Sequence, residues 1–256
     1  MGYKMKTLNE SITTAMDSQD VEIVPFLPYI LQDFWEIGTP PEVVIRVVKT
    51  QRFVPLQHVL DLGCGKGAVL VNLAAALKCN CYGIDGIPEF IETAKEKALE
   101  YGVDTLCRFE VGDVREKISI LDTFDVIILG GIGQVFGNYY TTLTTLSKHL
   151  TQNGIIIIND AYIDDSSIFQ HPLVLKRREL LKQVEQAGMH LIDEHTDIPI
   201  DSVREFKNLQ KRCKELMMKH IEESSLFERY VQTQADEYEA LEKKMIGSIM
   251  VFKVKE

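Results

Sequence analysis

The chain has 256 residues, of which 45% are hydrophobic and 26% are charged. This composition is typical of a globular protein, and the length suffices for one large domain with an added segment. The net charge of −10 at pH 7 argues against a nucleic-acid partner, because nucleic-acid binders use Lys and Arg to displace counterions from phosphates. No apolar run approaches the roughly 20 residues of a membrane span, so no membrane partner is expected.

The N-terminal twenty residues lack the apolar core of a secretory signal. The five cysteines are an odd number, which favours reduced thiols and a cytoplasmic location. Cys79 and Cys81 are the one close pair in the sequence, and two neighbours do not complete a tetrahedral metal site. We therefore expect no metal, and we interpret these cysteines as small buried residues entering a strand.

Apolar runs and helical patterns alternate along the chain from His58 to about His195. Strands are predicted at 58–63, 79–85, 105–113, 124–131, 155–160 and 189–195, and a seventh apolar run closes the chain at 246–254. Helices are predicted between them at 68–78, 88–102, 139–154 and 171–188. Strands that alternate with helices of this length indicate βαβ units and a parallel sheet, and continuous apolar strands indicate helices on both faces.

Two regions lie outside this alternation. Residues 1–50 precede the first strand and are predicted as an N-terminal helical cap, before a main domain at 51–256. Residues 199–244 lie between strands six and seven and repeat apolar residues every three to four positions, which predicts two amphipathic helices. We expect this insertion to pack with the cap as a lid, although the same helices are also suited to homodimer contact.

The glycine-rich stretch after the first strand, "LDLGCGKG", is the most informative motif. Gly63, Gly65 and Gly67 alternate, so the turn is not the G-x-G-x-x-G of dinucleotide-binding folds. Lys66 is followed by Gly67 rather than Ser or Thr, so it is not a phosphate-binding P-loop either. The turn indicates a ligand that approaches the backbone closely. Cys64 within it is interpreted as a small filler and Lys66 as a solvent-exposed side chain.

Five blocks in a fixed order resemble the class I S-adenosylmethionine-dependent methyltransferases: "VLDLGCGKG", "CYGIDG", "FEVGDVRE", "FDVIILGG" and "NGIIIINDAYI". The resemblance covers roughly His58 to His195. It implies an α/β, Rossmann-like, doubly wound sheet of seven strands, mostly parallel with an antiparallel last strand, plus the helical lid. It also implies S-adenosyl-L-methionine as cofactor and S-adenosyl-L-homocysteine as product.

The resemblance assigns cofactor roles to residues at the strand ends. Asp61 places a negative charge near the ammonium group, Asp85 accepts from the ribose hydroxyls, and Asp113 accepts from the adenine amino group. Each acid alone is also a common turn former or helix cap. The full set of expected cofactor-binding residues is Gly38, Asp61, Gly63, Cys64, Gly65, Gly67, Asp85, Gly86, Ile87, Asp113, Val114, Gly130 and Gly131.

Methyl transfer from a sulfonium needs a general base only when the acceptor must lose a proton, so no universal catalytic residue is expected. The candidates for a catalytic role are Asp160, Tyr162 and His171, and those for acceptor binding are Trp35, Tyr139, Tyr162 and Tyr230. Trp35 is equally suited to anchoring the N-terminal segment. His171 precedes Pro172 at a predicted helix start, where a surface cap is the simpler interpretation.

The segment after strand four, "LGGIGQVFGNYY", lacks the Asp/Asn-Pro-Pro-aromatic block of families that methylate DNA bases or glutamine side chains. We therefore expect methyl transfer to a small-molecule acceptor by in-line displacement. The alternatives are a protein or RNA methyltransferase, or a non-catalytic module that binds S-adenosylmethionine.

Overall fold

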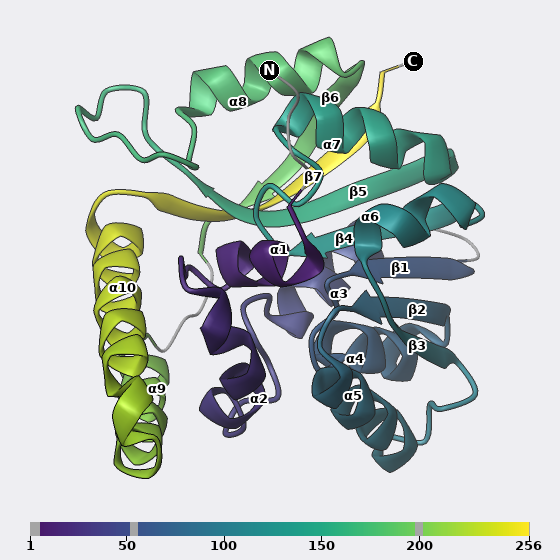
Figure 1. The fold of residues 1–256 in the computed structure, drawn as a ribbon. Coiled ribbons are helices and arrows are strands. Elements are labelled where there is room, and N and C mark those ends of the chain that lie inside the picture. Colours follow the sequence, from purple (N-terminus) through teal and green to yellow (C-terminus); the bar gives the residue numbers. More distant parts are fainter. Residues whose placement is uncertain (1–5, 52–55, 198–201, 256) are drawn as a thin grey trace. The chain divides into compact units, whose positions relative to one another are not determined.

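The structure is a computed structural model that describes residues 6–51, 56–197 and 202–255 (Figure 1). The chain forms two compact units. One contains Met1–Phe34 and Pro199–Lys244, and the other contains Trp35–Ile198 and Met245–Glu256. The larger unit holds the whole β-sheet, and the smaller unit is helical.

The larger unit is built on a seven-stranded sheet in the order β3-β2-β1-β4-β5-β7-β6. Its strands are β1 (His58–Leu62), β2 (Asn80–Asp85), β3 (Cys107–Val111), β4 (Phe124–Gly130), β5 (Leu150–Tyr162), β6 (Met189–His195) and β7 (Ile246–Val254). β7 runs antiparallel to β5 and β6, and the other neighbouring strands pair in parallel. The predicted doubly wound α/β sheet, with an antiparallel last strand, is confirmed.

Helices cover both faces of this sheet. They are α3 (Pro41–Thr50), α4 (Ala68–Leu77), α5 (Pro88–Glu100), α6 (Val114–Lys117), α7 (Tyr139–Leu146) and α8 (Arg177–Gln186), with short 3-10 turns at Ile118–Ile120 and Ser147–His149. One cluster of buried side chains includes Val47, Leu70 and Ile91 from α3, α4 and α5. A second cluster, on the other face, includes Leu143 of α7 and Leu180 of α8. Strands buried on both faces explain the continuous apolar runs in the sequence.

Two predicted helices are shorter than the sequence pattern indicates. The helix predicted at 139–154 ends at Leu146, and β5 begins at Leu150. Leu150 pairs with Phe124, and the extra residues of β5 before Ile155, which pairs with Val126, include the Asn-Gly pair. This pair therefore lies inside the longest strand rather than at a helix end. β-branched threonines, which are poor helix formers, fill much of the helical stretch before this point.

The helix predicted at 171–188 begins at Arg177 rather than beside Pro172. Ile163 forms a parallel bridge with Lys176 and exchanges backbone hydrogen bonds with Leu175 and Arg177. This bridge holds the chain extended up to Lys176, whose ψ is 144°. Helical geometry is therefore available only after the bridge.

The smaller unit brings the N-terminal residues and the insertion together. It contains α1 (Leu8–Ala15), a 3-10 turn (Val21–Phe26), α2 (Leu27–Ile30), α9 (Ser202–Lys219), a 3-10 turn (Ile221–Glu223) and α10 (Ser224–Lys243). The rings of Phe26 and Phe227 meet edge to face with centroids 4.9 Å apart. Arg212 binds both carboxylate oxygens of Asp33 at 2.7 Å. Among the described residues, no helix is both long and apolar enough to cross a membrane.

Candidate active site

Three acids lie at the carboxyl ends of three adjacent strands. Asp61 lies in β1, Asp85 ends β2, and Asp113 follows β3 by two residues. Because β1, β2 and β3 are neighbours and parallel, their carboxyl ends share one edge of the sheet. This edge adjoins the boundary between β1 and β4, where the strand order reverses, which is the usual ligand position in open α/β sheets.

The glycine turn between β1 and α4 is held against β2. Gly63, Gly65 and Gly67 all have positive φ, of +79°, +53° and +75°. The Gly65 N–H donates to Asp85 Oδ2 at 2.8 Å, and the Ile87 N–H donates to Asp85 Oδ1 at 2.9 Å. Asp85 therefore connects the glycine turn to the start of α5 through both of its carboxylate oxygens. Burial raises the pKa of Asp85, and these backbone N–H donors act in the opposite direction.

The three glycines differ in the space around them. A Cβ on Gly67 would lie 2.7 Å from the Ala94 Cβ and 2.9 Å from the Phe109 ring. A Cβ on Gly65 would have no atom within 4 Å. Gly67 is thus required by packing, whereas Gly65 leaves room beside the backbone. A ligand that passes close to the turn would occupy this space beside Gly65.

Asp61 is the most unusual acid of the site. Its side chain is 2% exposed, and its Oδ1 atom has no hydrogen-bond partner among the described residues. Burial, followed by the nearby Asp85 carboxylate, raises the pKa of Asp61 to about 8. A buried acid with an unsatisfied oxygen fits a cationic ligand group, because such a group would stabilise its ionised form.

Asp61→Asn is expected to stabilise the protein without ligand, increasingly as pH rises. The folded-state pKa of about 8 exceeds the ordinary 3.8, so the folded state binds an extra proton between these values. Stability from this group is therefore full at low pH and falls as pH approaches 8. We expect the variant to gain about 1–2 kcal/mol, or several degrees in Tm, at pH 8.5 and less at pH 6.

Thermal unfolding of both proteins at the two pH values tests this expectation, and Asp113→Asn is the matched control. Hydrogen bonds from Arg115 lower the pKa of Asp113, so its contribution is present at neutral pH and lost in acid. The control should lose stability by a similar amount at pH 6 and pH 8.5. A Tm gain for Asp61→Asn that did not grow with pH would contradict the assigned ionisation.

Asp113 is both a helix cap and a partner of Arg115. Its Oδ1 accepts from the Arg115 backbone N–H at 2.9 Å, and the Arg115 guanidinium contacts both carboxylate oxygens. Val114 and Ile87, the apolar residues predicted beside the acids, are 7% and 4% exposed. Val114 thus directly follows Asp113, and Ile87 lies two residues after Asp85.

The segment Trp35–Pro40, which we call the crossing segment, is tied to the sheet edge at two points. Trp35 Nε1 donates to the Lys66 carbonyl in the glycine turn at 2.9 Å. Asn159 Nδ2, in β5, donates to Thr39 Oγ1 at 3.0 Å. Thr39 is buried and packs so closely on Gly130 that a Cβ there would lie 2.5 Å from its hydroxyl oxygen. The absence of a side chain at Gly130, at the end of β4, therefore allows the crossing segment to pack closely against the strand.

The remaining expected glycines flank these contacts. Gly38 lies in the crossing segment with φ +83° and open space at its Cβ position. Gly131 has φ +70°, and its N–H donates to the Asn159 carbonyl at 3.1 Å. Gly86 follows Asp85 directly. Asn159 was missed by sequence reasoning. Its only signal was a polar residue at the carboxyl end of an apolar strand, beside Asp160.

Trp35→Phe is expected to cost about 1 kcal/mol of folding free energy, because it removes one hydrogen bond to the glycine turn and keeps an aromatic ring. The ring also contacts Tyr101, with centroids 5.1 Å apart, and the Lys97 ammonium. Trp35→Ala removes these contacts too and should cost more than Trp35→Phe. Denaturant unfolding of both variants measures the difference. Equal losses would show that the ring contacts contribute nothing.

The sequence-based expectations for Lys66 and Cys64, both in the glycine turn, have different outcomes. The expectation that Lys66 is solvent-exposed is wrong, because this residue is 6% exposed and its ammonium lies 5.5 Å from the centre of the Phe90 ring. The turn folds the lysine stem back onto α5, where the ring face offsets part of the cost of burying a charge. Cys64 is buried, and a Cβ on Gly83 would lie 2.8 Å from its sulfur, so its environment is that of a packed residue.

Tyr139 and Asp160 form a hydrogen-bonded pair beside the end of β5. The Tyr139 hydroxyl donates to Asp160 Oδ2 at 2.9 Å, and the Ala161 N–H donates to Asp160 Oδ1 at 2.7 Å. Burial raises the pKa of both groups, and their mutual contact raises that of the tyrosine further. As a whole residue Asp160 is half-buried. The pair can accept a proton or orient a donor group.

The surroundings of the other candidates, Tyr162, His171 and Tyr230, are as follows. Tyr162 is 6% exposed and has the Arg177 guanidinium over its ring, 5.7 Å from the centroid. His171 accepts at Nδ1 from the Leu173 and Val174 N–H groups, so it caps a loop turn and not the start of α8. Tyr230 belongs to the helical unit, where it is 3% exposed.

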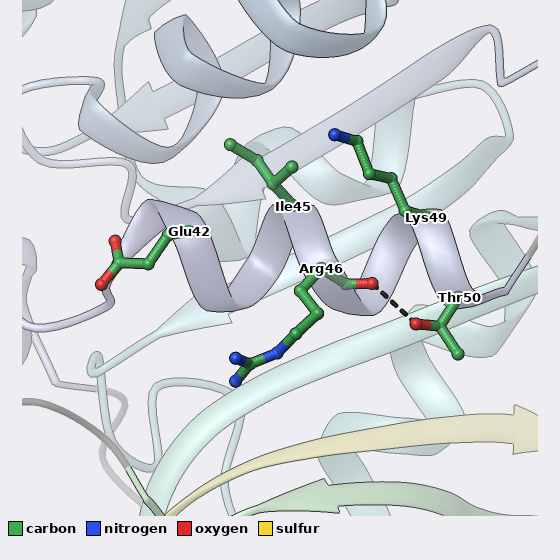
Figure 2. A pocket seen from close by; sticks show the side chains of 5 residues that line it. All are labelled: Glu42, Ile45, Arg46, Lys49 and Thr50. Atoms are coloured by element: carbon green, nitrogen blue, oxygen red, sulfur yellow. Dashed lines mark hydrogen bonds between the residues drawn. The ribbon is translucent and has the colours of Figure 1, made fainter.

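A surface hollow runs along α3 (Figure 2). Its lining combines one acid with two bases, and it is formed by Glu42, Ile45, Arg46, Lys49 and Thr50. The hydroxyl of Thr50 donates to the Arg46 carbonyl at 2.9 Å within the helix. None of these side chains is among the residues that the sequence predicts for the site.

Comparison with known proteins places this geometry in a family. A family profile described as a methyltransferase domain matches residues 55–244. An uncharacterized methyltransferase from Bacillus subtilis is 25% identical over 122 residues, which are 48% of this chain and 47% of that protein. A ubiquinone biosynthesis O-methyltransferase from Rickettsia akari is 32% identical over 105 residues, which are 40% of this chain and 39% of that protein. The chain thus spans half or less of the length of the curated relatives it matches.

Solved structures share the fold over most of the chain. A methyltransferase from Geobacter sulfurreducens, crystallised with S-adenosyl-L-homocysteine, has a TM-score of 0.75 at 20% identity and covers 90% of this chain and 98% of its own. A second, from Thiobacillus denitrificans and with the same ligand, has a TM-score of 0.73 at 19% identity, with coverage of 90% and 98%. The chain belongs to the methyltransferase-domain family, and its fold is that of the class I S-adenosylmethionine-dependent methyltransferases.

Proposed function

We propose that this chain is an enzyme that transfers a methyl group from S-adenosylmethionine to a small-molecule acceptor. The observation that carries the proposal is the edge formed by Asp61, the glycine turn and Asp85. There a buried acid with an unsatisfied oxygen lies beside a backbone that leaves room for a ligand. When bound, S-adenosylmethionine supplies an electrophilic methyl group on a sulfonium.

In this proposal the residues of the sheet edge hold the cofactor. Asp61 receives the ammonium group at its unpartnered oxygen, and the space beside Gly65 admits the methionyl portion. Asp85 accepts from the ribose hydroxyls, and Asp113 accepts from the adenine amino group between Ile87 and Val114. A carboxylate oxygen has two lone pairs, so Asp85 can accept from a ligand while keeping its backbone donors. At Asp113 a ligand would share the carboxylate with Arg115, which contacts both of its oxygens.

In this proposal the Tyr139–Asp160 pair takes up the proton that the substrate loses when it receives the methyl group. Asp160 has one hydrogen bond to each oxygen and keeps further lone pairs for an O–H or N–H of the substrate. Burial raises its pKa toward the range in which a carboxylate takes up a proton more readily. Tyr162 and His171 are supported less, because their polar atoms already have protein partners.

Three features support a small acceptor. The loop after β4 lacks the Asp/Asn-Pro-Pro-aromatic block, and the net charge of −10 disfavours RNA. Several relatives are named for small substrates, including the ubiquinone O-methyltransferase and an ajmaline N-methyltransferase from Rauvolfia serpentina. One relative is a release factor glutamine methyltransferase from Aliivibrio fischeri, which keeps a protein acceptor as the alternative.

The cofactor is tested by thermal unfolding with S-adenosylmethionine, S-adenosylhomocysteine, NAD or ATP. A ligand at about 100 times its dissociation constant stabilises by about 2.7 kcal/mol, or several degrees in Tm. We expect a shift with the first two ligands only. A shift with NAD alone would overturn the interpretation of the glycine turn.

The acceptor class is tested with methyl-labelled donor and a cell extract divided into small molecules, protein and RNA. We expect label in the small-molecule fraction only when this chain is present. Label confined to protein or RNA would favour the corresponding alternative. Donor binding without label in any fraction would favour a non-catalytic module.

A further inference from the structure

Three cysteine side chains converge at the amino edge of the sheet, away from the proposed cofactor site. Cys79 immediately precedes β2, Cys81 is its second residue, and Cys107 begins β3. Asp85 lies four residues beyond Cys81 along β2, or about 13 Å in an extended strand. The sequence shows only Cys79 and Cys81 as a pair. The parallel pairing of β2 with β3 brings Cys107 beside Cys81.

Cys81 is the shared neighbour of the other two thiols. Its sulfur lies 3.8 Å from that of Cys79. Cys81 is also the register partner of Cys107 across β2 and β3. Paired residues on adjacent strands have Cα atoms about 4.8 Å apart, which is inside the range that a disulfide spans.

The three thiols differ in access and acidity. Cys79 and Cys81 are buried, whereas Cys107 is half-exposed. The neighbouring Cys81 thiol lowers the pKa of Cys107 and that of Cys79, while burial acts against both, and Cys79 and the Asp104 carboxylate also act against Cys107. The outer thiol is therefore both reachable and more easily ionised, and the thiolate is the reactive form.

We propose that these three cysteines form an oxidisable site that a peroxide converts to a single disulfide with Cys81 as the shared partner. The Cys107 thiolate attacks one peroxide oxygen, the O–O bond breaks, and with hydrogen peroxide a water leaves. The Cys81 sulfur then attacks the resulting sulfenic acid, the S–O bond breaks, and a second water leaves as the S–S bond forms. Two thiols are oxidised by two electrons, and the peroxide is reduced to two waters.

Cys79 extends the site by thiol–disulfide exchange. Its thiolate can attack the Cys81 sulfur, which forms the Cys79–Cys81 bond and releases the Cys107 thiol without further oxidant. A metal does not account for the cluster as well, because the described residues contain no group of His, Cys, Asp or Glu arranged to hold a metal ion.

The test uses the full chain treated with hydrogen peroxide, alkylated under denaturing conditions and analysed by intact and peptide mass spectrometry. We expect a loss of two hydrogen atoms and three of the five thiols still alkylated. The disulfide should appear either as a peptide cross-linked between Cys81 and Cys107 or as one peptide with an internal Cys79–Cys81 bond. Loss of all five alkylation sites to higher oxides, or five intact thiols, would overturn the proposal.

Variants locate the shared partner. Cys79→Ala should still form the Cys81–Cys107 disulfide, whereas Cys81→Ala and the double variant Cys79→Ala/Cys107→Ala should form none. Cys213→Ala is the matched control, since this cysteine is buried in the helical unit, where burial raises its pKa to about 12. It should behave as the parent chain does. If Cys81→Ala does not fold, the double variant decides, and a disulfide in it would refute the role of Cys81.

Discussion

Asp85→Ala is expected to weaken S-adenosylhomocysteine binding by roughly 10- to 100-fold, because hydrogen bonds to a charged group contribute about 1.5–3 kcal/mol. Two losses combine in this variant. The proposed ribose contact disappears, and so does the carboxylate that holds the Gly65 and Ile87 N–H groups. Asp85→Asn retains one acceptor oxygen, so its affinity should lie between those of the parent chain and Asp85→Ala. Isothermal titration calorimetry measures all three affinities.

Asp125→Ala is the matched control for this experiment. Asp125, in β4, also accepts from two backbone N–H groups, those of Gln57 and His58 at 2.9 and 3.1 Å. These groups lie at the start of β1, at the opposite edge of the sheet from Asp85. The control should lose folding stability and keep its affinity. If both variants bind equally well, Asp85 has no part in holding the ligand.

The sequence predicts the parts of the fold that follow from short-range patterns. β7 has the bounds of its apolar run, and α5 begins at Pro88 and ends before Gly102, as start and stop residues indicate. The acids Asp61, Asp85 and Asp113 are recognisable because each stands where an apolar strand ends. Their alignment along one edge then follows from the parallel sheet.

Long-range contacts determine what the sequence does not predict. The bridge between Ile163 and Lys176 delays α8, and the pairing of Leu150 with Phe124 begins β5 early. Neither partner is visible in a local pattern. The burial of Lys66 depends on the Phe90 ring, which lies in another element. Asn159 becomes meaningful only when Thr39 lies beside it.

Gly67→Ala is expected to destabilise the fold by about 3 kcal/mol, and Tm should fall by roughly 6–12 °C. A side chain at φ +75° costs about 1–2 kcal/mol. The new methyl group would also press against the Ala94 Cβ and the Phe109 ring, which lie in the packed core and have little room to move. Thermal unfolding without ligand measures this loss.

Gly65→Ala separates the requirement for a ligand from the requirement for packing. Its φ of +53° suits alanine at a cost of about 1 kcal/mol, and the added methyl group meets no protein atom within 4 Å. The variant should therefore fold almost as stably as the parent chain, yet lose at least tenfold in S-adenosylhomocysteine affinity, because its methyl group occupies the space proposed for the ligand. Full affinity in this variant would show that the ligand does not pass this face of the turn. Comparing the two variants thus separates the glycine that the fold requires, Gly67, from the glycine that ligand binding requires, Gly65.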